Sequence, residues 1–595
     1  MEHESLTGTL VTSTGLEESF SVAQLPEQGS READVDVVIA GAGPSGLMLG
    51  CCLRLKGIRT AIVDPHPTPN ESVKAAVTMP RTLELLDLVG VVDKVLAAGN
   101  AITSMRIGGG KQWIGDMTGF GSSVCCRFGP LAVGQNVIAK ALERRFLELG
   151  GQVLRAAQLT GLRQHEAGVE ADVERRVYAR PPQRCWLHGC ANRDRTVLSA
   201  KYLVGADGKS SAVRGALGIP FDERTYPQGF YFGDVEIDRD EAATAGLRNT
   251  LHLLLDRGSF VSMIAVGGNL FRAYYCSRNL SRADLSEQAI TAAWAERFPA
   301  PGAPRNARFL RLEYYEIVEG LAEAYSRGRC FLVGDAAHAH SPAGGQGMNT
   351  GIQDAANLAW KLAAVLAGET SEGLLRSYER ERRPVAQKVL ATSDAMFRAF
   401  TNQSGCLLDA VRRHVMKAVM AVKGSKSLPL MFVKDRLFGL KITYRDAGTC
   451  ADSGGPVPKS ALAAGDRLPD MPHVTTDCAQ VTLHKLLCEQ FPAVTFSVVL
   501  VKAAPLDSED LSLVGGCLAR FEGGALRLAW WVVSAADPGA GPQLRAPEVS
   551  VKSGVPVRSL VPDASAGGAC LHGELRLRPG GASRAVLVVR PDGHL

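Results

Sequence analysis

The sequence FLVGDAAHAHSPAGGQGMNTGIQDAANLAWKL, residues 331–362, carries the strongest structural signal in this chain. Its first residues, Phe331–Val333, predict a short buried strand, and Gly334-Asp335 ends that strand with a carboxylate. A bare loop with three glycines follows, and a helical pattern of apolar residues begins near Asn349. The carboxylate can accept hydrogen bonds from a ribityl chain, and the helix N-terminus offers N–H groups and a positive dipole to an anionic ring. A reduced flavin requires both.

A second motif lies near the start of the chain and has the pattern of a β-α-β unit. Val35–Ala40 predicts a buried strand, Gly41–Gly46 (GAGPSG) a tight turn, and Leu47–Lys56 a helix. Thr60–Val63 predicts the next strand, and Asp64 ends it. A GxGxxG turn lets the backbone approach a pyrophosphate, and an acid about 20 residues later is where a ribose-binding carboxylate is expected. The segment therefore predicts a dinucleotide-binding turn.

The order GDAAH, SP, GGxGMN, GIQDA and NLAWKL resembles the second flavin motif of the FAD-dependent aromatic hydroxylases. That family includes para-hydroxybenzoate hydroxylase and phenol hydroxylase. The segment YLVGADGKSSAVR, residues 202–214, is similar to the DGxxSxxR motif of the same family. The resemblance implies that Asp207 lies near the FAD pyrophosphate and the path of NAD(P)H. It also implies that Arg214 braces this loop or faces phosphate.

The resemblance further implies individual roles in binding FAD. Asp335 would bind the ribityl chain, the carbonyl of Pro342 would lie near the flavin, and the loop Gly344–Asn349 would present N–H groups to the N1–C2=O edge of the ring. Gln135 starts a helix where the family often has a glutamine that touches FAD. The full set of FAD-binding residues that we predict is Gly41, Gly43, Pro44, Ser45, Gly46, Asp64, Gln135, Asp207, Gly208, Gly334, Asp335, Pro342, Gly344, Gly345, Gly347, Met348 and Asn349.

No catalytic side chain can be assigned from the sequence. A phenol hydroxylase benefits from a base that draws the phenol proton. Four tyrosines lie in the region expected to cover the flavin, but each is interpreted as sheet packing. They are Tyr231, Tyr274, Tyr314 and Tyr315.

The expected fold class is α/β, and 595 residues are enough for two or three domains. We expect a Rossmann-like FAD-binding domain with an inserted β-sheet substrate domain, followed by a thioredoxin-like α/β C-terminal domain. Residues 1–33 are interpreted as a disordered acidic tail and residues 34–448 as the FAD-binding hydroxylase domain. Its substrate-covering sheet is expected around 220–330, and residues 449–465 form the expected linker.

The thioredoxin-like assignment of residues 466–595 rests on resemblance. AGDRLPD (464–470) and TLHKLL (482–487) are similar to the C-terminal domain of the phenol hydroxylase branch. No CxxC motif occurs, so we expect a structural or dimer-supporting role and no dithiol chemistry.

The resemblance implies an FAD-dependent monooxygenase. NADPH or NADH would bind transiently and reduce FAD, and O2 would then hydroxylate a phenolic or other aromatic substrate through a flavin C4a-hydroperoxide. Two alternatives remain open at this point. One is an enzyme of the same fold, a monooxygenase or dehydrogenase, acting on a polyketide or quinone-type substrate. The other is a non-catalytic FAD-binding interaction protein.

Composition restricts the partners and the location. The 66 basic and 61 acidic residues nearly balance, and no basic block with interleaved aromatics occurs, so nucleic acid is not expected as a partner. The apolar segment Val37–Leu53 is short and rich in glycine, which argues against a transmembrane span. Fourteen cysteines without regular spacing, and no signal peptide, favour a cytoplasmic protein. A homodimer is compatible with these features.

No metal site is expected. Cys185, His188 and Cys190 lack the usual spacing of zinc ligands and a fourth ligand. His338 and His340 belong to the flavin motif, which explains them better than a metal does.

Overall fold

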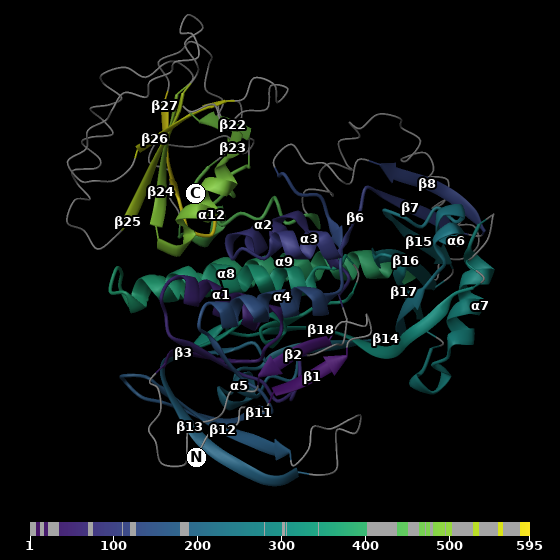
Figure 1. Ribbon diagram of the computed structural model, residues 1–595, viewed down its shortest axis with the longest axis horizontal. Coiled ribbons are helices and arrows are strands. Elements are labelled where there is room, and N and C mark those ends of the chain that lie inside the picture. The colour runs from purple at the N-terminus through teal and green to yellow at the C-terminus, as the bar shows by residue number, and fades with distance from the viewer. Residues whose placement is uncertain are drawn as a thin grey trace, which may run out of the picture.

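The computed structural model describes residues 7–11, 17–21, 35–69, 75–109, 111–118, 126–178, 190–256, 258–278, 280–299, 304, 306–342, 344–401, 437–449, 463–470, 472–475, 480–493, 495–502, 527–534, 557–562 and 584–595. Figure 1 shows the larger sheets around a central group of helices.

The first sheet aligns the ends of three strands that precede the sequence motifs. β3 (Val35–Ala40), β13 (Cys190–Gly205) and β20 (Cys330–Leu332) run parallel, with Gly205 opposite both Ala40 and Leu332. Because parallel strands end at the same edge of a sheet, this register brings the loops of all three motifs together. The remaining strands of this sheet are β4 (Thr60–Val63), β10 (Gln152–Leu154), β11 (Ala157–Gln164), β12 (Val169–Tyr178) and β19 (Ser326–Arg327).

Helix α1 (Pro44–Leu55) starts three residues earlier than predicted, because proline is well suited to the first position of a helix. It crosses α8 (Gly347–Leu366) at close range. A Cβ on Gly351 of α8 would lie 2.3 Å from Ser45 Oγ and 3.0 Å from Gly334 Cα, so the missing side chain of Gly351 makes room for this approach. Most of α8 is buried, as its apolar residues on all sides require.

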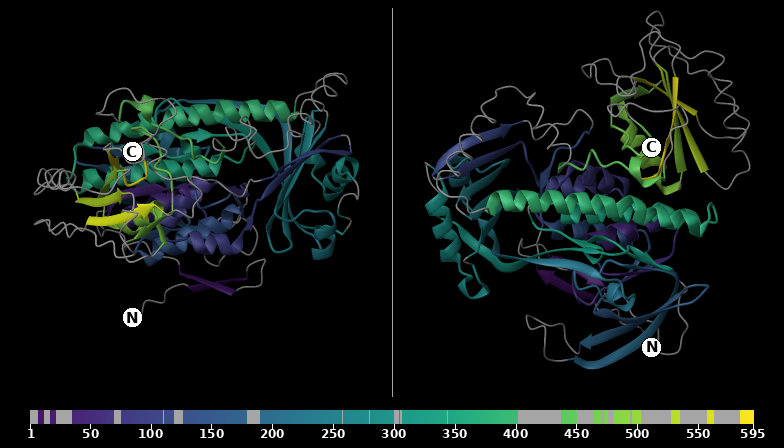
Figure 2. Two further views of the ribbon diagram at one scale, coloured as in Figure 1. Left: turned by 90° about the horizontal axis from the view of Figure 1, so that it is seen from above. Right: turned by 180° about the vertical axis from the view of Figure 1, so that it is seen from behind.

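A long helix connects the parts of the molecule. Figure 2 shows α9 (Arg376–Thr401) crossing between the first sheet and the C-terminal sheet and reaching the covering sheet. The other helices outside the C-terminal region are α2 (Pro80–Leu88), α3 (Val92–Ala98), α4 (Gln135–Glu148), α5 (Ala212–Ala216), α6 (Arg239–Thr244) and α7 (Glu287–Arg297). A small sheet joins β5 (Val77–Thr78), β9 (Leu131–Ala132) and β6 (Asn100–Ala101).

The covering sheet is larger than the predicted region around 220–330. Its strands, in spatial order, are β21 (His338–Ala339), β18 (Arg308–Ala322), β14 (Phe221–Glu236), β17 (Leu270–Ser277), β16 (Ser259–Gly267), β15 (Thr250–Asp256), β7 (Ser104–Gly109) and β8 (Gln112–Thr118). The hairpin β7–β8 joins through a parallel pair with β15, a long-range contact that no local pattern in the sequence reveals.

The C-terminal region contains a mixed six-stranded sheet with the spatial order β23-β22-β26-β25-β24-β27. β24 pairs in parallel with β25 and antiparallel with β27. Its elements are β22 (Pro472–Thr475), β23 (Gln480–Thr482), α12 (Leu483–Gln490), β24 (Thr495–Lys502), β25 (Arg527–Ser534), β26 (Val557–Pro562) and β27 (Arg584–Val589). Residues 450–462 of the expected linker lie outside the described residues. The thioredoxin-like assignment stays a prediction.

One expectation needs correction. The predicted disordered tail contains an antiparallel pair, β1 (Thr7–Val11) and β2 (Glu17–Ser21), because its threonine, valine and phenylalanine residues favour strands despite the acidic charge. β12 and β13 pair antiparallel as a hairpin. Residues 179–189, with Cys185 and His188, lie outside the described residues.

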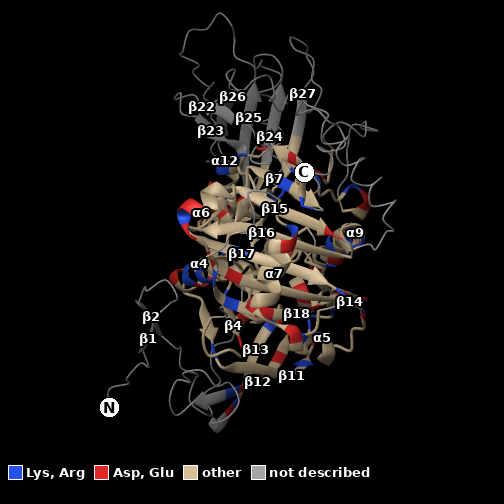
Figure 3. Cartoon of the chain, turned by 90° about the vertical axis from the view of Figure 1, so that its right-hand side faces the viewer, with Lys and Arg blue, Asp and Glu red and all other residues tan. Residues whose placement is uncertain are grey.

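Charged side chains are mixed in sign along the elements that Figure 3 draws in blue and red, including α4 and α6. None of the helices within the described ranges is long and apolar enough to cross a membrane.

Candidate active site

A cavity of about 440 Å³ lies between the loops of the first sheet and the covering sheet. Most of the predicted FAD-binding residues line it: Gly43, Pro44, Ser45, Gln135, Gly208, Asp335, Pro342, Gly344, Gly345, Gly347 and Met348. The other predicted residues are Gly41, Gly46, Asp64, Asp207, Gly334 and Asn349, and they do not line it. Among them, Asp64, Asp207 and Asn349 form hydrogen bonds with the backbone of the loops that border the cavity.

The glycines of the site have two different functions. A Cβ on Gly46 would lie 2.0 Å from the carbonyl oxygen of Gly41, and a Cβ on Gly41 would lie 2.3 Å from that of Ala206, so these two glycines let backbones touch. At Gly43, Gly208 and Gly347 a Cβ would meet nothing within 4 Å. The first pair therefore shapes the turn, and the other three leave room beside the cavity.

Asp64 lies at the end of β4 and holds the glycine turn. Its Oδ2 accepts a hydrogen bond from Ala42 N at 2.7 Å, and its Oδ1 accepts one from His66 N at 2.9 Å. Arg155 NH1 lies 3.3 Å from Oδ1. Burial would raise the pKa of Asp64, but the His66 hydrogen bond, the Arg155 charge and the Ala42 N–H keep that pKa below its usual value. Asp64 is therefore an anion at neutral pH, and sequence reasoning missed its partner Arg155.

The loop of the second motif is braced from within. Asp207 Oδ2 accepts from Val213 N at 3.1 Å, and Asp207 Oδ1 is buried without a hydrogen-bond partner. Burial raises the pKa of Asp207. Arg214 donates to the carbonyl oxygens of Ala336 (2.8 Å) and Lys209 (2.6 Å). The resemblance implied that Arg214 either braces this loop or faces phosphate, and these two contacts support the bracing role.

The third motif places an acid and a helix N-terminus on the cavity. Asp335 is exposed there, while its neighbours are buried. Helix α8 begins at Gly347, two residues before the predicted start, and Gln346 at its N-cap makes no side-chain cap. Asn349 binds the glycine loop from behind: its Nδ2 donates to Gly345 O (2.6 Å) and Val77 O (3.0 Å).

Gln135 lies at the start of α4, where it lines the cavity and also forms hydrogen bonds with the backbone of Ala75. Its Oε1 accepts from Ala75 N at 3.3 Å, and its own N–H donates to Ala75 O at 3.1 Å. The glutamine thereby holds the strand-like segment that leads to α2.

These features fit FAD. The N-termini of α1 and α8 carry no side-chain cap, so their N–H groups can receive a pyrophosphate and an electron-rich ring edge. The open space at Gly43, Gly208 and Gly347 allows close approach of a ligand to the backbone. Bound FAD would supply the electron transfer and oxygen chemistry that amino-acid side chains do not perform.

The other half of the cavity is aromatic and uncharged. Its described lining residues are Ile102, Met105, Phe230, Phe232, Leu251, Leu253, Phe260, Ser262, Tyr274, Tyr315, Met396, Phe400, Leu437 and Phe438. The strands of the covering sheet alternate their side chains, so Tyr274 lines this cavity while Tyr275 packs in the outer core.

All four tyrosines pack against core clusters, as interpreted from the sequence, but two of them also line the cavity. Tyr274 and Tyr315 line the cavity, whereas Tyr231 and Tyr314 belong to the outer core. Burial raises the pKa of Tyr274 against the opposing effect of Arg272, which hydrogen-bonds it. Arg272 is held in turn by Asp234, with Nε 2.7 Å from Oδ1.

A cluster that the sequence did not suggest joins α2 to α12. His484 Nε2 lies 3.0 Å from Asp87 Oδ2 and 3.3 Å from Cys488 Sγ. These three residue types can hold a metal ion. Arg127 already forms an ion pair with the same oxygen of Asp87, so the carboxylate charge is neutralised without a metal. The i, i+4 spacing of His484 and Cys488 was the available signal, but Asp87 is 397 residues away from His484.

The family model for the FAD binding domain matches residues 34–393. A flavin-dependent monooxygenase from Mycobacteroides abscessus is 32% identical over 450 residues, which cover 73% of this chain and 83% of the relative. A 12-dehydrotetracycline 5-monooxygenase/anhydrotetracycline 6-monooxygenase from Streptomyces rimosus is 34% identical over 370 residues, or 60% of this chain and 69% of the relative. The solved OxyS anhydrotetracycline hydroxylase from Streptomyces rimosus superposes with a TM-score of 0.62 at 26% identity, covering 94% of this chain and 95% of that one.

The expected fold class, cofactor and reaction type agree with these findings. The family model extends over more than half of the chain, and the relatives are monooxygenases. The non-catalytic alternative is therefore not favoured. The chain belongs to the FAD-binding domain family and is an FAD-dependent monooxygenase that uses NAD(P)H.

Proposed function

We propose that the chain uses O2 to hydroxylate a fused-ring phenol of the polyketide class that carries no carboxylate. The uncharged aromatic half of the cavity carries this proposal. A substrate with a carboxylate would need a cationic partner there, because a buried unpaired charge is costly. None of the described residues that line this half is charged.

The arrangement of the rings suits a flat substrate. Phe230 lies 5.6 Å from Tyr274 and 6.2 Å from Phe260 between ring centroids, and Phe400 lies 5.8 Å from Phe260. Such rings favour a flat aromatic ligand through edge and face contacts. The tetracycline-type substrates named for one relative and one solved structure are fused-ring phenols, which supports this substrate class for the present chain.

We further propose roles for the FAD-binding residues. The α1 N-terminus with Gly43 and Ser45 receives the pyrophosphate, and Asp64 binds the ribose. Asp335 binds the ribityl hydroxyls, and the N-terminus of α8 binds the N1–C2=O edge of the ring. The support is the position of these groups around one cavity, or directly behind its loops in the case of Asp64.

We also propose a homodimer, a cytoplasmic location and the predicted domain boundaries. Buried free cysteines in the described part of the chain support a reducing compartment: Cys51, Cys52, Cys126, Cys276 and Cys330.

Light scattering during size-exclusion chromatography tests the dimer, and a monomer at micromolar concentration would contradict it.

The test of the activity is NADPH and NADH oxidation by the FAD-loaded protein with three probes. We expect anhydrotetracycline, and more weakly 4-nitrophenol, to accelerate oxidation and to gain one oxygen atom from ¹⁸O2 by mass spectrometry. 4-Hydroxybenzoate, which carries a carboxylate, should not. Acceleration by 4-hydroxybenzoate alone, or stoichiometric peroxide with every probe, would contradict the proposal.

A further inference from the structure

Two buried polar atoms of the HAHSP segment lack hydrogen-bond partners and belong to residues that line the cavity. They are His340 Nε2 and Ser341 Oγ. His340 is 8% exposed and Ser341 is 1% exposed, so neither atom is satisfied by bulk water. A buried polar group without a partner is costly, which indicates that a ligand supplies the partner.

Behind His340, the polar contacts continue without a gap. His340 Nδ1 lies 3.4 Å from His338 Nδ1, and His338 Nε2 lies 2.5 Å from Asp354 Oδ2. Asp354 Oδ1 accepts from Arg382 Nε at 2.7 Å. His338, Asp354 and Arg382 are all 0% exposed. The chain of contacts therefore has one open end, at the cavity.

The partners assign the protons on the two rings. Asp354 is an anion beside Arg382, so His338 Nε2 must carry the hydrogen that it donates to the carboxylate. In a neutral His338, Nδ1 is then an acceptor, and His340 Nδ1 donates to it. His340 Nε2 is left with a lone pair that no described group of the protein uses, in a residue that lines the cavity.

We propose that His340 is the base that takes the proton of the substrate hydroxyl, with His338 and Asp354 as the residues that position it and receive the charge. This inference rests on the proposed phenolic substrate. The O–H bond breaks, and the proton binds His340 Nε2 while the oxygen keeps the electron pair. The Nδ1 hydrogen of His340 passes to His338 Nδ1, and the resulting cation lies against Asp354. The phenolate ring is richer in electrons than the phenol and reacts more readily with an electrophilic oxygen.

The surroundings keep His340 neutral until a proton arrives. Burial, and secondarily the neighbouring His338, hold the pKa of His340 well below 6.5. The lone pair is therefore available, but the ring alone is a weak base, so the proton is held only when the charge passes to His338 beside Asp354. Asp354 raises the pKa of His340 against these two effects. The titratable and charged groups that contact the pair or its carboxylate are Asp354 from α8, Arg382 from α9 and Tyr325 from the segment before β19. Tyr378 of α9 packs on Tyr325.

The first test compares His340→Gln with His252→Gln in the FAD-loaded protein. His252 is a matched control: it is a fully buried, neutral histidine of β15 that packs between Trp113 and Phe298. The absorbance of bound 4-nitrophenol reports its ionisation across pH. We expect bound 4-nitrophenol to ionise at lower pH than free 4-nitrophenol in the wild type and in His252→Gln, and to lose this shift in His340→Gln.

Turnover gives a second readout. In His340→Gln, kcat/KM for anhydrotetracycline should fall about 100-fold at neutral pH and recover as the pH rises through the pKa of the free phenol. FAD affinity should stay within about twofold. Equal pH profiles for His340→Gln and the wild type, or loss of FAD from the variant, would overturn the proposal. If no probe accelerates NADPH oxidation in the wild type, the proposed substrate class fails first.

A third measurement needs no substrate. ¹⁵N NMR of histidine-labelled, FAD-loaded protein reports which ring nitrogen carries hydrogen. The signal that disappears in His340→Gln should be that of a neutral ring protonated at Nδ1. An Nε2-protonated ring would overturn the relay, even where no phenol binds.

Discussion

Substitution of Asp335 should affect FAD binding directly, because Asp335 is the acid of the GDAAH motif and lines the cavity. A carboxylate makes stronger hydrogen bonds to hydroxyls than an amide does. We therefore expect Asp335→Asn to weaken FAD binding about 10- to 100-fold, which corresponds to roughly 1.5–3 kcal/mol. Quenching of FAD fluorescence measures the affinity. Asp222→Asn, an exposed acid of β14, is the control and should leave FAD affinity unchanged.

Tyr274 tests the aromatic half of the cavity. Burial raises the pKa of its phenol, so it remains a hydrogen-bond donor at neutral pH. Tyr274→Phe should raise the KM for a phenolic substrate about 10-fold and increase peroxide release, because one hydrogen bond that orients the ligand is lost. FAD affinity should not change.

The neighbouring residue supplies the control for that experiment. Tyr275→Phe changes the same group on the other face of β17, in the outer core. It should leave both KM and peroxide release unchanged. A Tyr274→Phe variant with wild-type coupling would exclude Tyr274 from substrate binding.

At the scale of elements, the strands and glycine turns could be predicted from the sequence, whereas the elements that pair or pack with them could not. Thr60–Val63 was predicted with the bounds that β4 has, because a short apolar run between turn residues has a single interpretation. The addition of β7–β8 to the covering sheet depends on a parallel pair with β15, distant in sequence. The role proposed for His340 was missed for the same reason: its neighbour His338 meets Asp354 only when α8 folds over β21.

A substitution at Gly46 tests the close backbone contact within the glycine turn. Gly46→Ala would bring a Cβ to 2.0 Å from the carbonyl oxygen of Gly41, and backbone cannot move aside as a flexible side chain can. We expect a loss of about 3 kcal/mol or more in the free energy of unfolding, together with loss of FAD. Thermal melting and flavin content measure both effects.

The control for the glycine turn lies in α5. A Cβ on Gly215 would meet nothing within 4 Å, and this residue is exposed on the helix. Gly215→Ala should therefore be neutral or stabilising by up to about 1 kcal/mol. Equal stability of the two alanine variants would contradict the proposed close approach.

On the scale of the whole molecule, residues 590–594 bind the helices α8 and α9. Arg590 binds Glu381 of α9 through two hydrogen bonds of 2.8 and 2.9 Å, and Asn357 of α8 lies 3.3 Å from Asp592. His594 packs on Tyr444, with ring centroids 4.4 Å apart. Tyr444 in turn bonds Arg382, so the chain terminus connects to the residues behind the cavity.

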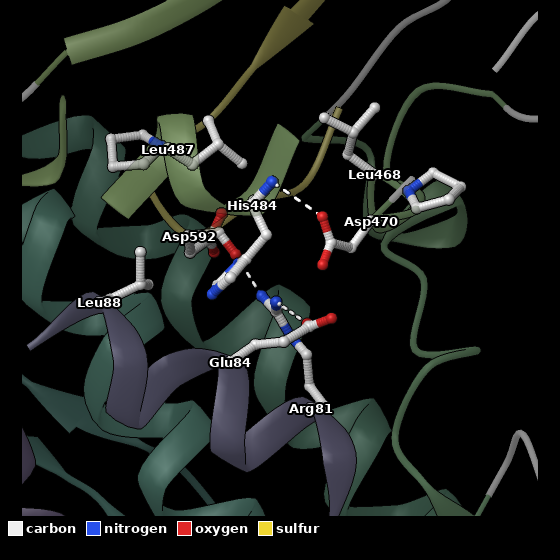
Figure 4. Close-up of a pocket in the computed structure, with 11 residues that line it drawn as sticks. Arg81, Glu84, Leu88, Leu468, Asp470, His484, Leu487 and Asp592 are labelled. Atoms are coloured by element: carbon white, nitrogen blue, oxygen red, sulfur yellow. Dashed lines mark hydrogen bonds and ion pairs between the residues drawn. The ribbon is translucent and has the colours of Figure 1, made fainter. Parts of the chain in front are cut away.

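A second set of buried charges joins α2 to the C-terminal region. Figure 4 shows Arg81 and Glu84 of α2 facing Asp470, His484 and Asp592 across a small cavity. Glu84 is 1% exposed and forms ion pairs with Arg81, at 2.7 Å, and with Arg467. Burial would raise the pKa of Glu84, but the charges of Arg467 and Arg81 keep this pKa well below its usual value.

Glu84 therefore makes docking of the C-terminal region dependent on pH. A carboxyl whose pKa is lower in the folded state stabilises that state above its unfolded pKa of about 4.3, and this stabilisation is lost as the pH falls below it. We expect Glu84→Gln to lower the free energy of unfolding by about 3–5 kcal/mol at neutral pH, because two buried arginines lose their partner. The variant should also lose less stability than the wild type between about pH 5 and pH 3.

Thermal melting across this pH range measures both effects, and an exposed pair provides the contrast. Asp116 pairs with Arg106 on the surface, with side chains 43% and 34% exposed. Asp116→Asn should cost less than about 1 kcal/mol, because solvent screens such a pair. If Glu84→Gln melts like Asp116→Asn at every pH, the C-terminal region is held by its apolar contacts, and the buried charges only fix its orientation.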